Sequence, residues 1–116
     1  MINFITYQLF IEVNEPITLA IGKLGRFDFP AGSYVYTGSA KAHMEARIAR
    51  HLSVDKKLRW HIDYLLNACG VHVSKVARSV ESECTLNQKT AGTHLVAKFG
   101  ASDCQAGCIS HLKYLP

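Results

Sequence analysis

The hydrophobic residues of this chain change their spacing along the sequence, and this change restricts the folds that the chain can adopt. Residues 4–13 (FITYQLFIEV) are rich in β-branched and aromatic residues, and their alternation is typical of a strand with one buried face. In residues 42–52 the apolar side chains of Met44, Ile48 and Leu52 instead recur at every fourth position, which is the spacing of an amphipathic helix. The sequence therefore predicts strands and helices in one α+β domain.

Further periodic segments and turn-forming residues complete the predicted arrangement. Strands are predicted at residues 17–21, 34–37, 71–80 and within 109–115, and helices at 58–69 and from Glu83 to near Gly92. Gly70 ends the first of these helices, and Ser82 caps the start of the second. The glycines and the proline of residues 22–32 are interpreted as turns, and residues 94–99 fit no element clearly. We expect a single domain over residues 1–116, with a small, mainly antiparallel sheet flanked by about three helices.

The composition is that of a folded chain. Of the 116 residues, 48% are hydrophobic and 19% are charged, which is too apolar for a disordered segment. No apolar run reaches the ~20 residues that a membrane span needs, and Asn3, Thr6 and Gln8 interrupt any secretory signal in the first ten residues. Without an export signal, the four cysteines are expected to stay reduced. These features predict a cytoplasmic protein with no membrane partner.

Positive charge is concentrated in one part of the sequence. The formal net charge is +4, which suits a polyanionic partner such as nucleic acid. Many of the Lys and Arg residues fall within residues 41–59, together with several histidines and few acidic residues. We expect this segment to form a phosphate-binding surface. Its nucleic-acid-binding candidates are Lys41, His43, Arg50, Lys56, Lys57 and Arg59.

Short motifs connect the strands with the basic segment. The tripeptide YTG (residues 36–38) precedes the helix that carries RIARH (residues 47–51), and ITY (residues 5–7) lies on the first strand. This arrangement resembles the signature of the GIY-YIG endonucleases. Glu83 opens a later helix where that family keeps its metal-binding glutamate. The resemblance spans residues 5–83.

A closer resemblance involves longer strings. The chain resembles an uncharacterised branch of the same superfamily, which is found alone or fused to endonuclease III-type repair glycosylases. The strings that carry this resemblance are PAGSYVYTGSA, RIARHL, RWHIDYLL and FGASDC with CISHL. The resemblance implies a GIY-YIG nuclease-like fold and a metal-dependent endonuclease acting on structured or damaged DNA in repair. It further implies Mg²⁺ or Mn²⁺ as the cofactor, and DNA and a repair protein as partners.

The resemblance also implies the roles of five catalytic residues. Tyr7 would take a proton from the attacking water, and Tyr36 would help to position that water. Arg47 would neutralise the phosphate with its planar fork of donors, and His51, one turn later, would hydrogen-bond a phosphate or a tyrosine hydroxyl. Glu83 would hold Mg²⁺, with waters in the remaining positions. Three further residues are secondary candidates for this site: Gly38, His61 and Asp63.

Two alternatives remain open. Ile5 stands where the family name has its first glycine, which fits a non-catalytic nucleic-acid-binding module that retains the nuclease fold. Near the C-terminal end, Cys104, Cys108 and His111 offer three of the four ligands usual for zinc, which fits a zinc-stabilised interaction domain. Their spacing differs from that of a familiar zinc knuckle, so thiols packed under a loop are the favoured interpretation.

Overall fold

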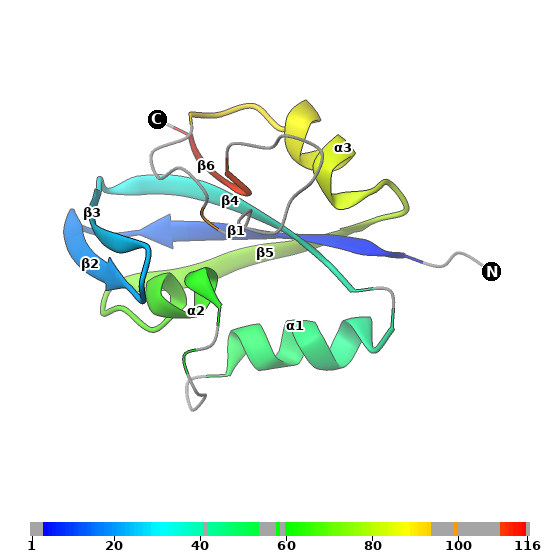
Figure 1. Cartoon of the computed structure of the whole chain (residues 1–116), viewed down its shortest axis with the longest axis horizontal. Helices are drawn as coiled ribbons and strands as arrows, with labels where there is room; N and C mark the ends of the chain where they lie inside the picture. The colour runs from blue at the N-terminus through cyan, green and yellow to red at the C-terminus, as the bar shows by residue number, and fades with distance from the viewer. Residues whose placement is uncertain are drawn as a thin grey trace.

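The computed structural model describes residues 4–40, 42–53, 58, 60–93, 99 and 110–115. Four of its strands form one sheet: β1 (Thr6–Val13), β4 (Gly32–Ser39), β5 (Val71–Ser79) and β6 (Leu112–Leu115). Their order is β5-β1-β4-β6, and all neighbours are antiparallel (Figure 1). The predicted α+β class with a small antiparallel sheet is confirmed.

The register of the sheet decides which side chains share a face. β1 is a central strand, paired on both sides, and most of its residues are buried. Its pairing with β4 places Tyr7 opposite Gly38 and Leu9 opposite Tyr36. Because cross-strand partners point to the same face and side chains alternate along a strand, Tyr7 and Tyr36 lie on one face and Gln8 lies on the other.

Helices cover the sheet on both faces (Figure 1). α1 (Met44–Leu52) and α2 (His61–Leu66) lie on one side of it, and α3 (Glu83–Lys89) lies on the other. Gln8 marks the α3 side, because its Nε2 donates a hydrogen bond to Thr90 Oγ1 at 2.7 Å, directly after α3. Tyr7 therefore faces α1 and α2.

The boundaries of two helices differ from the prediction. α2 begins at His61 instead of residue 58, since Trp60 is extended (φ −105°, ψ 157°), and it ends at Leu66 because residues 67–70 turn into β5. α3 begins at Glu83 with Ser82 as its N-cap, as predicted, but it ends at Lys89 because Thr90 leaves helical backbone.

The interpretation of residues 22–32 as turns was wrong in part. β3 (Gly25–Phe29) pairs with β2 (Ile17–Ile21) in a separate two-stranded antiparallel sheet. Gly25 is at the start of this strand, where its φ of 126° is one that other residues rarely adopt. The sequence did not reveal β3 because its five residues are too few to show a clear alternation of polar and apolar side chains, and the neighbouring glycines indicate turns.

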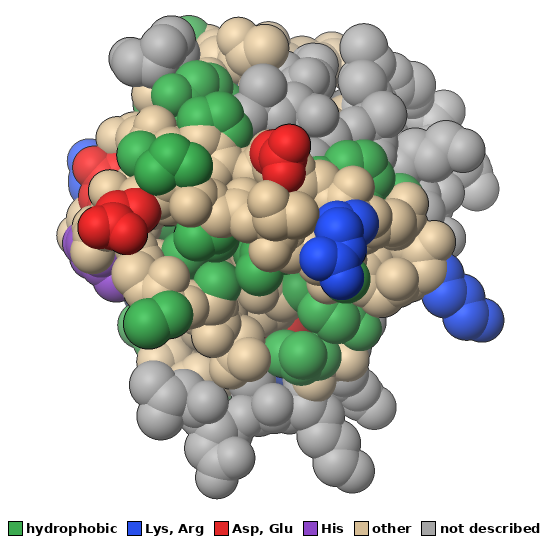
Figure 2. Space-filling view, turned by 90° about the vertical axis from the view of Figure 1, so that its left-hand side faces the viewer, with side chains coloured by type: hydrophobic (Ala, Val, Ile, Leu, Met, Phe, Trp, Pro, Cys, Tyr) green, Lys and Arg blue, Asp and Glu red, His purple; other side chains and the backbone are tan. Residues whose placement is uncertain are grey.

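Both sheets share one hydrophobic core. Ile21 and Phe29 of the small sheet are completely buried in the same cluster as Leu9 of β1 and Leu65 of α2. Hydrophobic side chains are also visible on the outer surface at the β2–β3 side of the molecule, where the visible basic side chains are isolated from one another (Figure 2). In the part of the chain that the structure describes, no helix is long and apolar enough to cross a bilayer.

Candidate functional site

Tyr7 and His51 meet under α1. The Tyr7 hydroxyl lies 2.6 Å from His51 Nε2, and each residue is only 2% exposed. Tyr7 comes from the centre of the sheet, and His51 comes from the last turn of α1. A hydrogen bond this short between buried groups gives the hydroxyl a fixed proton partner.

Gly38 makes room for this pair. A Cβ atom at position 38 would lie 2.5 Å from the Tyr7 hydroxyl oxygen and 2.6 Å from the ring carbon that bears it. Real Cβ atoms do not approach other atoms so closely, so the glycine of YTG allows the Tyr7 ring to lie flat across β4. Tyr36 completes the group, with its ring edge-on to His51 at 6.2 Å between centroids.

Burial keeps both tyrosines protonated. It raises the pKa of Tyr7, and the carboxylates of Glu83 and Asp63 add to the increase, while the cation of Arg47 opposes it. Burial likewise raises the pKa of Tyr36, and Tyr7 and Glu83 add to that increase. Neither phenol is an anion near neutral pH.

Arg47 lies on the same helix as His51, one turn earlier. Its Nη1 donates a hydrogen bond to the Ser39 carbonyl oxygen at 2.7 Å, and its Cζ lies 5.1 Å from the centroid of the Trp60 ring. Among the described residues, no carboxylate forms an ion pair with Arg47. A planar guanidinium held in this way is suited to bind an anion such as a phosphate.

Arg50 is engaged differently. Its two terminal nitrogens donate to the two carboxylate oxygens of Asp63, each at 3.0 Å, and Asp63 is completely buried. The Arg50 Cζ also lies 4.3 Å from the Trp60 ring centroid. The negative charge of Asp63 offsets the positive charge of Arg50, and the guanidinium is predominantly a structural group in this arrangement.

Glu83 lies on the other side of the sheet from Tyr7 and Tyr36, at the start of α3 (Figure 1). Its side chain is 28% exposed at the start of α3, and its Oε1 lies 3.2 Å from His111 Nδ1. The Cys84 Sγ lies 3.8 Å from His111 Nε2. In the described part of the chain, no three His, Cys, Asp or Glu side chains form a group that would hold a metal ion. Among the described residues, Glu83 could therefore offer a metal ion one carboxylate ligand.

Other predicted residues lie elsewhere or outside the described residues. His61 packs against Phe99 at 5.6 Å between ring centroids, and His43 is exposed directly before α1 with a left-handed backbone (φ 57°). The remaining predicted candidates lie outside the described residues: Lys41, Lys56, Lys57, Arg59, Cys104 and Cys108.

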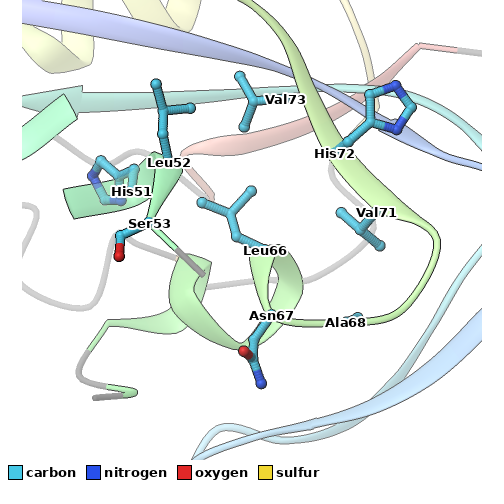
Figure 3. Close-up of a pocket in the computed structure, with 9 residues that line it drawn as sticks. All are labelled: His51, Leu52, Ser53, Leu66, Asn67, Ala68, Val71, His72 and Val73. Atoms are coloured by element: carbon cyan, nitrogen blue, oxygen red, sulfur yellow. The ribbon is translucent and has the colours of Figure 1, made fainter. Parts of the chain in front are cut away.

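A pocket of about 360 Å³ adjoins His51 where α1, α2 and β5 meet (Figure 3). Its lining combines the apolar side chains of Leu52, Leu66, Val71 and Val73 with four polar residues, His51, Ser53, Asn67 and His72. Asn67 points away from the apolar side chains (Figure 3). The pocket is a recess of mixed polarity next to His51, and no Lys, Arg, Asp or Glu lines it.

Sequence reasoning did not assign Trp60 to the site. Its ring contacts Arg47, Arg50 and His51, the last at 5.5 Å between centroids. A signal was present, because an aromatic residue directly after a basic segment is a common companion of phosphate-binding side chains. The position of Trp60 before α2 nevertheless gave no indication of the α1 side chains that it contacts.

The fold and the site define a small α+β domain with a buried tyrosine–histidine pair and, on the same helix as the histidine, an arginine that no described carboxylate pairs with. The chain belongs to the family described as a domain of unknown function, DUF123, whose model matches residues 6–116. No curated protein and no solved structure is significantly similar to it. The family match therefore covers every element of the fold and all of the site residues above.

Proposed function

We propose that this protein is a metal-dependent endonuclease of the GIY-YIG type that hydrolyses phosphodiester bonds in DNA. The observation that carries the proposal is the 2.6 Å contact between the Tyr7 hydroxyl and His51 Nε2, immediately beside Arg47. In this proposal His51 supplies a proton acceptor and Arg47 an anion-binding cation. Hydrolysis of a phosphodiester needs both, because water must lose a proton while negative charge develops on the phosphate.

Arg47 binds the scissile phosphate in this proposal. Its Nη1 is directed to the Ser39 carbonyl, which fixes the guanidinium plane and leaves other donors of the fork for phosphate oxygens. The phosphate would lie next to Arg47, one turn before His51 on the helix whose His51 contacts Tyr7.

The proton of the attacking water passes through Tyr7 to His51. Because burial raises the pKa of Tyr7, its phenol is neutral and accepts a proton only if it gives up its own. His51 Nε2, at 2.6 Å, is the acceptor for that second proton. The water oxygen then bonds to phosphorus, the bond to the leaving oxygen breaks, and that oxygen takes a proton from solvent.

Glu83 would hold the divalent cation. Its carboxylate is partly exposed, and only its Oε1 contacts His111, which fits a hard cation that keeps most of its waters and takes one protein carboxylate. Mg²⁺ or Mn²⁺ held there would lie on the α3 side of the sheet, and its positive charge would act on the site across the sheet, as the Glu83 carboxylate does on the pKa values of Tyr7 and Tyr36. Zinc is less suited to this single carboxylate, because it prefers thiolate and imidazole ligands.

Substrate choice rests on DNA shape in this proposal. The net charge of +4 favours a polyanion, and in this proposal the site residues bind backbone phosphates, which carry no sequence information. Flaps, branches and damaged duplexes of DNA repair are therefore the proposed substrates, with a repair protein as a further partner.

Cleavage of labelled flap, branched and linear DNA with Mg²⁺ or Mn²⁺ tests the proposal. Tyr7→Phe and His51→Ala should each lower the rate by about 10²- to 10⁴-fold, as expected for loss of a general base. Arg47→Ala should lower it by roughly 10²- to 10³-fold. Arg26→Ala on β3, which removes an exposed arginine far from the site, should cleave like the wild-type protein.

The pH dependence gives a second readout. A protonated His51 has no acceptor on Nε2, so cleavage should be lost once the pH is low enough to protonate that ring. Equal cleavage by the wild type and all three site variants would refute the proposed site. Absence of wild-type cleavage, with DNA binding that still depends on Arg47, would favour the non-catalytic binding module.

A further inference from the structure

Trp60 connects the two arginines of α1. Arg47 and Arg50 are one turn apart on the helix, and their guanidinium carbons lie 5.1 and 4.3 Å from the centroid of the same indole ring. Cations at this distance from an aromatic ring are attracted to it. Of the two arginines, Arg50 is paired with Asp63, whereas Arg47 has no carboxylate partner among the residues that the structure describes.

The Trp60 ring is itself held by buried groups. The Trp60 backbone N–H donates to Asp63 Oδ2 at 2.9 Å, and the same buried carboxylate binds Arg50 with both oxygens. His51 packs against the indole from α1, at 5.5 Å between centroids. One carboxylate therefore fixes both the backbone of Trp60 and the guanidinium that lies on its ring.

We infer that Trp60 is a positioning residue that holds the Arg47 guanidinium ready for a phosphate, and that Asp63 holds Trp60 in place through its backbone and through Arg50. The inference rests on the proposed role of Arg47 in binding DNA phosphate. An arginine side chain has several freely rotating bonds, so an unsupported guanidinium would be ordered only when the phosphate arrives. The Ser39 carbonyl and the Trp60 ring restrain it beforehand.

A double-mutant cycle tests this inference through binding of a labelled DNA duplex at fixed low salt. Trp60→Leu should weaken binding by on the order of 3- to 10-fold, the range of one cation–aromatic contact. Trp60→Phe keeps a ring and should restore most of the affinity. In the Arg47→Ala background, Trp60→Leu should have no further effect beyond about twofold, because it acts through Arg47. Phe27→Leu, a half-buried aromatic truncation on β3, is the matched control.

The outcomes separate this inference from the proposed function. If Arg47→Ala weakens binding and Trp60→Leu does not, or if the two effects multiply, Trp60 does not position Arg47, while the proposed site stands. If Arg47→Ala itself leaves binding unchanged, both the inference and the proposed phosphate site fail.

Measurements on the wild-type chain keep the test decisive if Trp60→Leu does not fold. The Arg47 side-chain Nε–H resonance, assigned with Arg47→Lys, should be shifted upfield by the indole ring and should show Overhauser contacts to its protons. Trp60→Phe should reduce that shift and keep the contacts. An Arg47 resonance at the position of a solvated arginine, without contacts to Trp60, would overturn the inference.

Discussion

At the scale of single residues, the centre of this protein contains polar side chains that are buried and paired. Tyr7 contacts His51, Gln8 contacts Thr37 and Thr90, and Asp63 contacts Arg50. Buried polar groups cost free energy unless they are hydrogen-bonded, so these pairs restrict the positions that the side chains can take. Burial of the Tyr7 and Tyr36 hydroxyls, in turn, raises the pKa of both residues.

Stability should decrease at alkaline pH. The pKa values of Tyr7, Tyr34 and Tyr36 are raised in the folded state, above the value near 10 expected in the unfolded chain. Between these values the folded protein binds more protons than the unfolded one, so the free energy of unfolding falls as the pH rises above about 10. Urea unfolding between pH 8 and 11 measures this slope.

The contribution of Tyr7 can be isolated in the same experiment. Tyr7→Phe removes one of the groups with a raised pKa, so its alkaline slope should be smaller than that of the wild type. Tyr64→Phe is the control, since Tyr64 is only half-buried on α2. Identical slopes for the wild type and Tyr7→Phe would contradict the burial of the Tyr7 hydroxyl.

Gly38→Ala should lower the free energy of unfolding, although the strand propensities of the two residues alone predict only a small effect. The added Cβ would overlap the Tyr7 hydroxyl, so the ring must move away from His51. Overpacking of this kind costs about 1–3 kcal/mol in the free energy of unfolding, measured by urea denaturation. Ser39→Ala, at the next position of β4, should cost less than Gly38→Ala. Equal stability of Gly38→Ala and the wild type would show that Tyr7 is not packed over β4.

At the scale of elements, α3 is attached to the sheet through its C-terminal end. The Lys113 Nζ of β6 donates hydrogen bonds to the carbonyl oxygens of Asn87 and Thr90, and Lys113 is only 5% exposed. The carbonyls at the end of a helix lack partners within it and carry partial negative charge. A buried ammonium therefore satisfies them and fixes the helix that carries Glu83.

Lys113→Met should loosen α3 more than it changes the rest of the fold. Loss of charge-assisted hydrogen bonds to buried carbonyls is expected to cost about 2 kcal/mol in the free energy of unfolding. Amide hydrogen exchange of α3 should accelerate more than that of β1. Lys75→Met, which removes an exposed lysine of β5, is the control and should leave the exchange of α3 unchanged. If amide exchange of α3 were unchanged in Lys113→Met, the hydrogen bonds of Lys113 would not be what holds α3 in place.

Periodicity identified most elements correctly, and its failures have physical reasons. Residues 4–13, 17–21 and 71–80 contain the observed strands β1, β2 and β5, because their alternation is long or their β-branched content is high. β3 was not predicted because its five residues are too few to show a clear alternation. It forms a strand because it pairs with β2. Glu45, the acidic residue in the first turn of α1, is exposed and forms an ion pair with Arg78 of β5.

At the scale of the whole molecule, the two sheets behave as parts of one core. Ile21 and Phe29 of the small sheet are buried in the same cluster as the central strand. Phe29 also contacts the ring of Phe99 edge-on, and Phe99 contacts Tyr36. If one sheet separated from this cluster, hydrophobic side chains of the other sheet would be exposed to water.

Unfolding should therefore be a single cooperative transition. Trp60 fluorescence reports on the α1–α2 side, and far-ultraviolet circular dichroism reports on the sheets, and their urea midpoints should coincide. Phe29→Ala should shift both midpoints together, by an amount corresponding to about 3–5 kcal/mol. Arg26→Ala on the same strand should shift neither. Separate midpoints in the wild type would show that the β2–β3 sheet unfolds on its own.

The sequence by itself determined the class of the fold, the face of β1 that carries Tyr7, and the spacing of Arg47 and His51 on one helix. These are local properties, because strand alternation and helical periodicity depend only on neighbouring residues. Only the tertiary structure decided that His51 meets Tyr7, that Asp63 neutralises Arg50 but not Arg47, and that Trp60 lies against both arginines. Those contacts join residues from different elements, and their geometry follows from how the helices pack on the sheet.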